Sequence, residues 1–114
     1  MSTPENAAPS EYIELDSEER FEEIIDTYDV VLVDFYADWC GPCKMMEPTI
    51  ESIATGTAAA VLKVNVDHFQ GLASRFGVRG IPTVLLFADG EQVERAVGVQ
   101  SEDDLSSMIA EYTA

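Results

Sequence analysis

The two cysteines of the chain are separated by two residues, as Cys40-Gly41-Pro42-Cys43, and their type and spacing indicate chemistry most directly. Thiols placed this way can close and open a disulfide with little movement, because residues three apart share one face of a helix. A helix beginning near Cys40 would point free backbone N–H groups and its positive dipole end at that sulfur, which favours the thiolate. Pro42 suits a first helical turn, where its missing N–H is not needed. The spacing therefore predicts thiol–disulfide redox chemistry.

Three other roles for a cysteine pair fit this sequence less well. A permanent structural disulfide would close a very short loop and contribute little stability. A zinc site needs about four ligands, whereas the chain has two cysteines and one histidine, His68, which we interpret as a surface residue near a helix start. Covalent haem attachment requires histidine after the second cysteine, where Lys44 stands. We therefore expect no metal and no tightly bound cofactor.

Alternating apolar segments predict the elements that must position the cysteines. An apolar run over Val30–Ala37, ending just before the pair, is typical of a strand buried on both sides. Four segments carry apolar residues at helical spacing: Phe21–Tyr28, Met46–Ala54 with Pro48 expected to kink it, Phe69–Phe76, and Leu105–Tyr112 after a capping-box-like Ser101. Further strands are expected over Tyr12–Leu15, Ala60–Val66, Thr83–Phe87 and Gln92–Val97, with a hairpin turn at Asp89-Gly90.

The predicted order of elements is β-α-β-α-β-α-β-β-α, which indicates parallel strands joined by helices and then an antiparallel hairpin. We expect an α/β fold with one central mixed sheet of about five strands flanked by about four helices. A length of 114 residues suits one domain. Residues 1–10 are polar and contain two prolines, so we expect a flexible N-terminal tail followed by a folded domain over residues 11–114.

Charge is the unusual feature of the composition, with 22 acidic residues against 6 basic ones and a formal net charge of −16. Such a chain repels phosphates and anionic membranes, so we expect neither nucleic acid nor membrane as a partner. The acidic residues form either an ordinary solvated surface or an adaptation to high salt, where screening weakens self-repulsion. Residues 1–10 lack the basic start and apolar stretch of an export signal, which favours a cytoplasmic protein.

Two motifs resemble one known family. The segment over residues 33–44, VDFYADWCGPCK, resembles the active-site segment of the thioredoxin family, and Gly80-Ile81-Pro82-Thr83 resembles its cis-proline loop. The resemblance covers about Tyr12 to Tyr112. It implies the thioredoxin fold and a protein-disulfide reductase that exchanges disulfides with target proteins and is regenerated by a separate reductase. We expect it to act as a monomer.

The resemblance also implies roles for individual residues. Cys40 would be the exposed nucleophile and Cys43 the partly buried resolving thiol, joined as a Cys40–Cys43 disulfide after oxidation. Asp34 matches a buried aspartate that accepts or relays the proton of the resolving cysteine, and burial would raise its pKa. Lys63 matches a lysine that accompanies this aspartate, although a surface lysine at a strand edge would explain it nearly as well. Pro82 matches the cis-proline.

A shallow apolar rim for docking the target is implied by the same resemblance. It would consist of Trp39, Gly41, Pro42, Ile81, Pro82, Gly98 and Val99, with the backbone of Ile81 pairing with an extended target segment. Two residues depart from the family pattern. Tyr36 stands where a second tryptophan is common, and Asp38 adds a negative charge that raises the pKa of a nearby thiol.

Two other functions remain open at this stage. On the same fold the protein could be a disulfide isomerase or oxidant, although Gly41-Pro42 and the apparent lack of an export signal favour a reductant. It could also be a binding module that regulates a partner according to its own redox state. A redox potential separates the first alternative from a reductant, since oxidants have a much higher potential.

Overall fold

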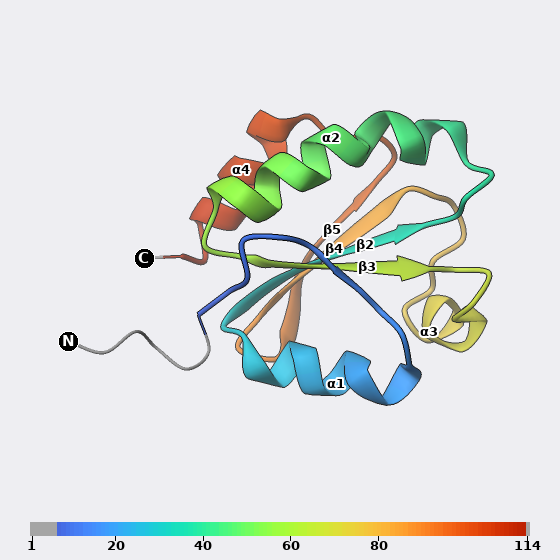
Figure 1. Ribbon diagram of the computed structural model, residues 1–114, viewed down its shortest axis with the longest axis horizontal. Helices are drawn as coiled ribbons and strands as arrows, with labels where there is room; N and C mark the ends of the chain where they lie inside the picture. Colours follow the sequence, from blue (N-terminus) through green and yellow to red (C-terminus); the bar gives the residue numbers. More distant parts are fainter. Residues whose placement is uncertain (1–6, 114) are drawn as a thin grey trace.

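The computed structural model describes residues 7–113 and contains a five-stranded sheet with helices on both faces (Figure 1). The elements are β1 (Ile13–Glu14), α1 (Glu18–Thr27), β2 (Val30–Tyr36), α2 (Gly41–Gly56), β3 (Ala60–Asn65), α3 (Gln70–Arg75), β4 (Thr83–Ala88), β5 (Glu91–Val97) and α4 (Glu102–Ala110). This order confirms the predicted one, and each strand end lies within one residue of the predicted end.

The strand order is β1-β3-β2-β4-β5, so β2 lies in the middle of the sheet. It pairs in parallel with β3 and antiparallel with β4, while β4 and β5 form the expected hairpin. Both turn residues, Asp89 and Gly90, have positive φ, which suits a tight hairpin connection. Because β2 is the central strand, the residues that follow its carboxyl end lie at the middle of that end of the sheet.

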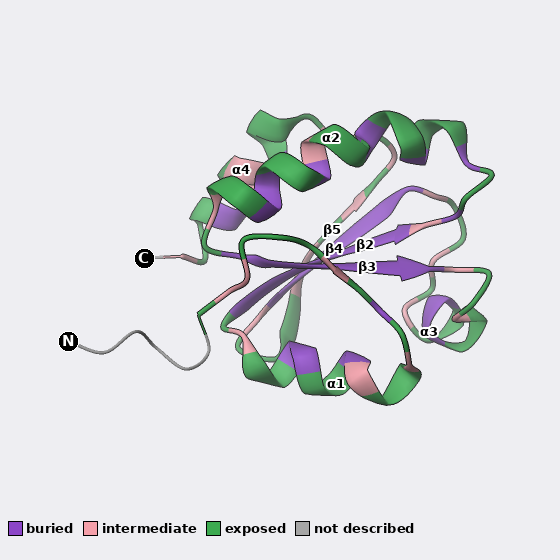
Figure 2. Ribbon diagram, in the orientation of Figure 1, coloured by how far each residue is buried: buried purple, intermediate pink, exposed green. Residues whose placement is uncertain are grey.

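Side chains of β2 alternate between the two faces of the sheet. Val31, Val33 and Phe35 pack into a core beneath α1 and α3, whereas Val30 and Leu32 pack into a core beneath α2 and α4. Figure 2 shows the central strands buried along most of their length. Burial on both faces explains why the sequence of β2 is a continuous apolar run.

The helices bury most of the faces that the sequence spacing predicts, but the prediction is wrong for Tyr112, because α4 ends at Ala110 and the Tyr112 side chain beyond it is exposed. Phe21, Ile24 and Ile25 of α1 are buried. Helix α2 continues through Pro48 to Gly56. The predicted cap of α4 is present, because the hydroxyl of Ser101 accepts a hydrogen bond of 3.1 Å from the backbone N–H of Asp104.

The N-terminal tail predicted over residues 1–10 lies partly outside the described residues, which begin at residue 7. Of its described part, Ala8 packs against the core beneath α1, and the carbonyl of Ser10 accepts a 3.4 Å hydrogen bond from Thr55. Over residues 7–113, no helix is long and apolar enough to cross a membrane.

Candidate active site

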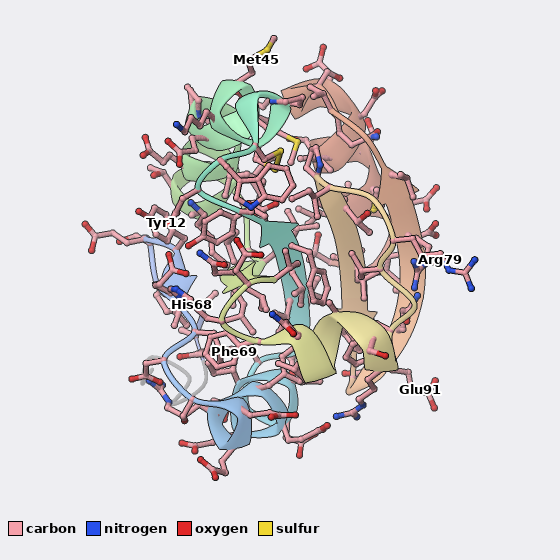
Figure 3. The ribbon with its side chains drawn as sticks, turned by 90° about the vertical axis from the view of Figure 1, so that its right-hand side faces the viewer. Tyr12, Met45, His68, Phe69, Arg79 and Glu91 are labelled. Atoms are coloured by element: carbon pink, nitrogen blue, oxygen red, sulfur yellow. A yellow bond between two sulfur atoms is a disulfide. The ribbon has the colours of Figure 1, made fainter. Side chains whose placement is uncertain are left out.

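The cysteine pair lies where β2 leads into α2, at the sheet edge that faces the viewer in Figure 3. Cys40 caps the helix: its Sγ accepts a hydrogen bond of 3.2 Å from the backbone N–H of Cys43. The two residues form a disulfide, with Cα atoms 5.3 Å apart. Pro42 is in the first turn, as expected. In the reduced protein the same N–H and the helix dipole would stabilise a Cys40 thiolate.

Both cysteines are buried in this disulfide form, with 4% of Cys40 and 5% of Cys43 exposed. The expectation that Cys40 is the exposed member is therefore wrong for the oxidised state. The physical reason is local packing: Sγ of Cys40 lies 3.9 Å from the carbonyl oxygen of Ile81, and the half-buried side chains of Tyr36 and Val66 also pack on the pair. A target must approach along the small remaining opening.

The loop before β4 forms one wall of this opening. The peptide between Ile81 and Pro82 is cis, as the resemblance implies. The loop is fixed at both ends, because Thr83 Oγ1 donates a 2.6 Å hydrogen bond to the carbonyl of Gly80 and the N–H of Gly98 donates a 2.8 Å bond to the carbonyl of Pro82. Gly98 has φ +91, a conformation that glycine adopts without strain.

The predicted rim residues differ in exposure, and Ile81 packs against the cysteine pair. Trp39, Gly41, Pro42 and Val99 are exposed, Ile81 and Gly98 are half-buried, and Pro82 is buried beneath them. Trp39 is 70% exposed, and its indole N–H donates a hydrogen bond of 2.8 Å to Asp67. That contact ties the ring to the turn after β3.

Sequence reasoning missed three residues at this end of the molecule. Asp67 holds Trp39 from the turn after β3. Val97 and Met45 are strongly exposed apolar residues, and Met45 projects outward from α2 in Figure 3. An apolar residue on the polar face of a predicted helix was the available signal for Met45. His68 is exposed, as expected, and the described residues contain no cluster of acidic, cysteine or histidine side chains suited to a metal.

Beneath α2, a row of charged residues crosses the sheet. The strand register places Glu14 of β1 beside Lys63 of β3, and Lys63 beside Asp34 of β2. Asp34 has the same parity along β2 as Leu32, which packs beneath α2, so its side chain is on the cysteine-bearing face. The next neighbour in the row, Val84 of β4, is apolar.

Asp34 is buried, and its Oδ1 has no hydrogen-bond partner among the described residues. Burial raises the pKa of Asp34 from 3.8 to about 7; the charge of Lys63 lowers it, and the charges of Glu14 and Glu47 raise it. A carboxyl group with this pKa exchanges protons readily near neutral pH.

Lys63 is only 5% exposed, so the interpretation of a surface lysine at a strand edge is wrong. Its Nζ lies 3.6 Å from Oε1 of Glu47 on α2, and 4.3 and 4.9 Å from the ring centroids of Tyr36 and Tyr12. The phenol of Tyr36 in turn donates a 2.6 Å hydrogen bond to Glu14. Lys63 therefore ion-pairs with Glu47 and affects Asp34 through space.

Comparison with known proteins gives a consistent result. The thioredoxin family model matches residues 12–111. A thioredoxin of Chlamydia caviae is 42% identical over 98 residues, which span 85% of this chain and 95% of that protein. A solved structure of a mutant thioredoxin from Halobacterium salinarum is 53% identical, covers 95% of this chain and 96% of its own, and has a TM-score of 0.91. A thioredoxin structure from Nicotiana alata is 37% identical, covers both chains fully and has a TM-score of 0.83.

Proposed function

Because the chain belongs to the thioredoxin family, we propose that it works in the cytoplasm as a reductant of target proteins, with a separate reductase as its electron donor. Dithiol–disulfide exchange through Cys40 and Cys43 is its protein-disulfide oxidoreductase activity. The observation that carries the proposal is the disulfide at the N-terminus of α2 with the buried Asp34 on the sheet face below it.

The first step is attack by the Cys40 thiolate on one sulfur of the target disulfide. A bond forms between Cys40 Sγ and that sulfur, the target S–S bond breaks, and the second target sulfur leaves as a thiolate that takes a proton from solvent. The N–H of Cys43, which points at Cys40 Sγ, stabilises the attacking thiolate. The target is then held covalently as a mixed disulfide.

The second step releases the target. The thiol of Cys43 gives its proton to the Asp34 carboxylate and attacks Cys40 Sγ, forming the Cys40–Cys43 disulfide as the bond to the target breaks. The target leaves with a second thiolate, which takes a proton from solvent. Two electrons have then moved from the protein dithiol to the target disulfide, and the reductase restores the dithiol.

The rim around the disulfide would hold the target during both steps. Trp39 and Val99 are exposed apolar side chains, and Ile81, whose carbonyl lies near Cys40, would offer backbone groups to an extended segment. Burial of this apolar surface would favour docking without selecting a sequence. We propose that one monomer is sufficient for this interaction.

The test uses two cysteine variants and insulin as the disulfide substrate. Cys40→Ser should abolish reduction, because the first bond to the target cannot form. Cys43→Ser should accumulate a mixed disulfide that is visible on a non-reducing gel, because the resolving thiol is missing. Turnover retained in both variants would refute the mechanism. A single stoichiometric partner captured without a covalent bond would instead support a regulatory binding module.

The direction of electron flow has its own test. Equilibration of the protein with glutathione buffers should give a reduction potential of about −270 mV, that of a reducing thioredoxin, and not of about −120 mV, that of a strong oxidant. A potential close to the second value would replace the proposed reductant with an oxidant on the same fold.

We further propose that the acidic surface is an adaptation to high salt. The net charge of −16 supports this, as does the similarity to a Halobacterium salinarum protein. Screening at molar potassium chloride weakens repulsion among the surface carboxylates, so the unfolding midpoint should rise between dilute and molar salt. An unchanged or lower midpoint would contradict the adaptation.

A further inference from the structure

Lys63 is buried beside the buried Asp34, and three carboxylates compete for its positive charge. Asp34 adjoins it on β2, Glu14 adjoins it on β1, and Glu47 reaches it from α2. The ammonium can make a close ion pair with only some of these groups at once. Which partner it takes decides how much positive charge Asp34 experiences.

In the structure, Lys63 forms its ion pair with Glu47. The Nζ–Oε1 distance is 3.6 Å, whereas Oδ1 of Asp34 has no hydrogen-bond partner among residues 7–113. The rings of Tyr36 and Tyr12 lie against the ammonium at 4.3 and 4.9 Å, which adds cation–π attraction at the same position. Glu14 is itself engaged by the phenol of Tyr36. Lys63 is thus held by groups other than Asp34.

We propose that Glu47 is a positioning residue for the exchange reaction: it keeps Lys63 from pairing closely with Asp34, so that Asp34 stays basic enough to take the proton of Cys43. This inference rests on the proposed role of Asp34. Glu47 touches neither the target nor the reacting sulfurs, and it acts through Lys63. Its carboxylate is half-exposed, whereas Lys63 is buried.

The electrostatics of the site have the sign that the proposal requires. Lys63 lowers the pKa of Asp34, while Glu47 and Glu14 raise it against that effect. Removing the Glu47 charge should lower the pKa of Asp34 for two reasons. A nearby anion is lost, and Lys63 is freed to move toward Asp34. A weaker base would accept the Cys43 proton less readily.

The experiment follows the Asp34 carboxyl by ¹³C NMR titration in the oxidised protein, where the cysteines do not titrate. In Glu47→Gln the midpoint should fall by roughly half a pH unit to one unit, less than a fully buried charge would produce. Glu51→Gln is the matched control, because it removes the same charge one turn further along the exposed face of α2. An unchanged midpoint in Glu47→Gln, or an equal fall in Glu51→Gln, would overturn the proposal.

Two further variants separate this inference from the proposed mechanism. In a Lys63→Met background, Glu47→Gln should move the midpoint much less, whereas an equal shift would overturn the route through the lysine. The pH profile of insulin reduction should move to lower pH in Glu47→Gln but not in Glu47→Gln combined with Asp34→Asn. If Asp34→Asn alone leaves that profile unchanged, the role of Asp34 fails, while the titration still decides whether Glu47 controls its proton.

Discussion

The two faces of the central sheet are built from alternate residues of the same strands, yet they differ in kind. Beneath α1 and α3, β2 contributes Val33 and Phe35 to an apolar core, and among the described residues this face has no buried charged side chain. Beneath α2 and α4, the intervening position is Asp34, adjacent to the buried Lys63. A register shift of one residue would exchange the two faces completely.

The first face contributes mainly to stability, and the second contains the ionisable groups proposed to act in the reaction. Aromatic rings dominate the first face: Phe21 lies 5.4 Å from Phe76 and 6.0 Å from Phe87, between ring centroids. Such packing stabilises without any ionisable group. The second face contains the buried carboxyl of Asp34, which destabilises the fold relative to an apolar side chain, and this is the face covered by the disulfide-bearing α2. Its cost to stability is offset by the aromatic face.

The largest expected effect tests the aromatic face. Phe21→Ala leaves a cavity beside the rings of Phe76 and Phe87 and should lower the free energy of unfolding by about 3–5 kcal/mol. Insulin reduction per folded molecule should remain close to that of the parent, because Phe21 itself packs on Phe76 and Phe87 and neither cysteine belongs to this core, although Ile81 of the rim packs against it. Urea denaturation at pH 7 measures the first quantity. A loss below about 1 kcal/mol would mean that the core collapses around the cavity.

The second prediction tests the charged face through pH. The folded pKa of Asp34 is raised to about 7 from 3.8, so the folded state binds this proton more tightly than the unfolded chain does. Stability is therefore lost as pH rises from about 4 to about 7, by up to about 4 kcal/mol at about 1.4 kcal/mol for each unit. Asp34→Asn should remove that loss and be more stable than the parent at pH 8.

The measurement is the difference in unfolding free energy between parent and variant across this pH range. Asp26→Asn on the exposed surface of α1 is the control, and its difference should stay flat. If the difference in unfolding free energy between the parent and Asp34→Asn is the same at every pH, Asp34 ionises in the folded protein at no cost in stability. The two faces would then not differ in this respect.

Much of this contrast could be predicted from the sequence. The apolar run around Asp34 predicted a strand buried on both faces, and the resemblance to the thioredoxin family implied that Asp34 is a buried carboxyl. The Cys40 and Cys43 spacing located the redox centre on the first turn of a helix. These features are local, and local patterns specify strands, helices and the face of each residue.

The remaining features depend on packing between distant segments. The sequence did not reveal that Glu47 would take Lys63, because the ion pair joins α2 to β3 and depends on the register of β3 beside β2. Nor did it reveal that Cys40 would be buried, since the Ile81 loop that covers it lies 41 residues away. The exposure of Cys40 depends on such contacts between distant segments, and the spacing of residues along the sequence does not predict them.

The third prediction separates the charged row from the rest of its face. Ser101→Ala removes the cap of α4 and should cost about 1 kcal/mol at every pH. Helix α4 covers the same face through Leu105 and Ile109, but it has no role in the proton relay. Urea denaturation at pH 4 and pH 8 should give the same loss. A loss of unfolding free energy that changes with pH would show that the pH dependence of this face is not confined to Asp34 and Lys63.

The smallest expected effect comes from a pair of variants that replace one glutamate by glutamine, one on each side of the sheet. Glu22→Gln breaks an ion pair with Arg75 between α1 and α3, where both side chains are 53% exposed. Its effect on stability should be below about 1 kcal/mol and should shrink with salt, because solvent screens exposed pairs. The pH profile of insulin reduction should not move at all. Glu47→Gln breaks a pair with a buried lysine and should move that profile, so equal profiles in the two variants would show that the position of a carboxylate beside the charged row is irrelevant to the chemistry.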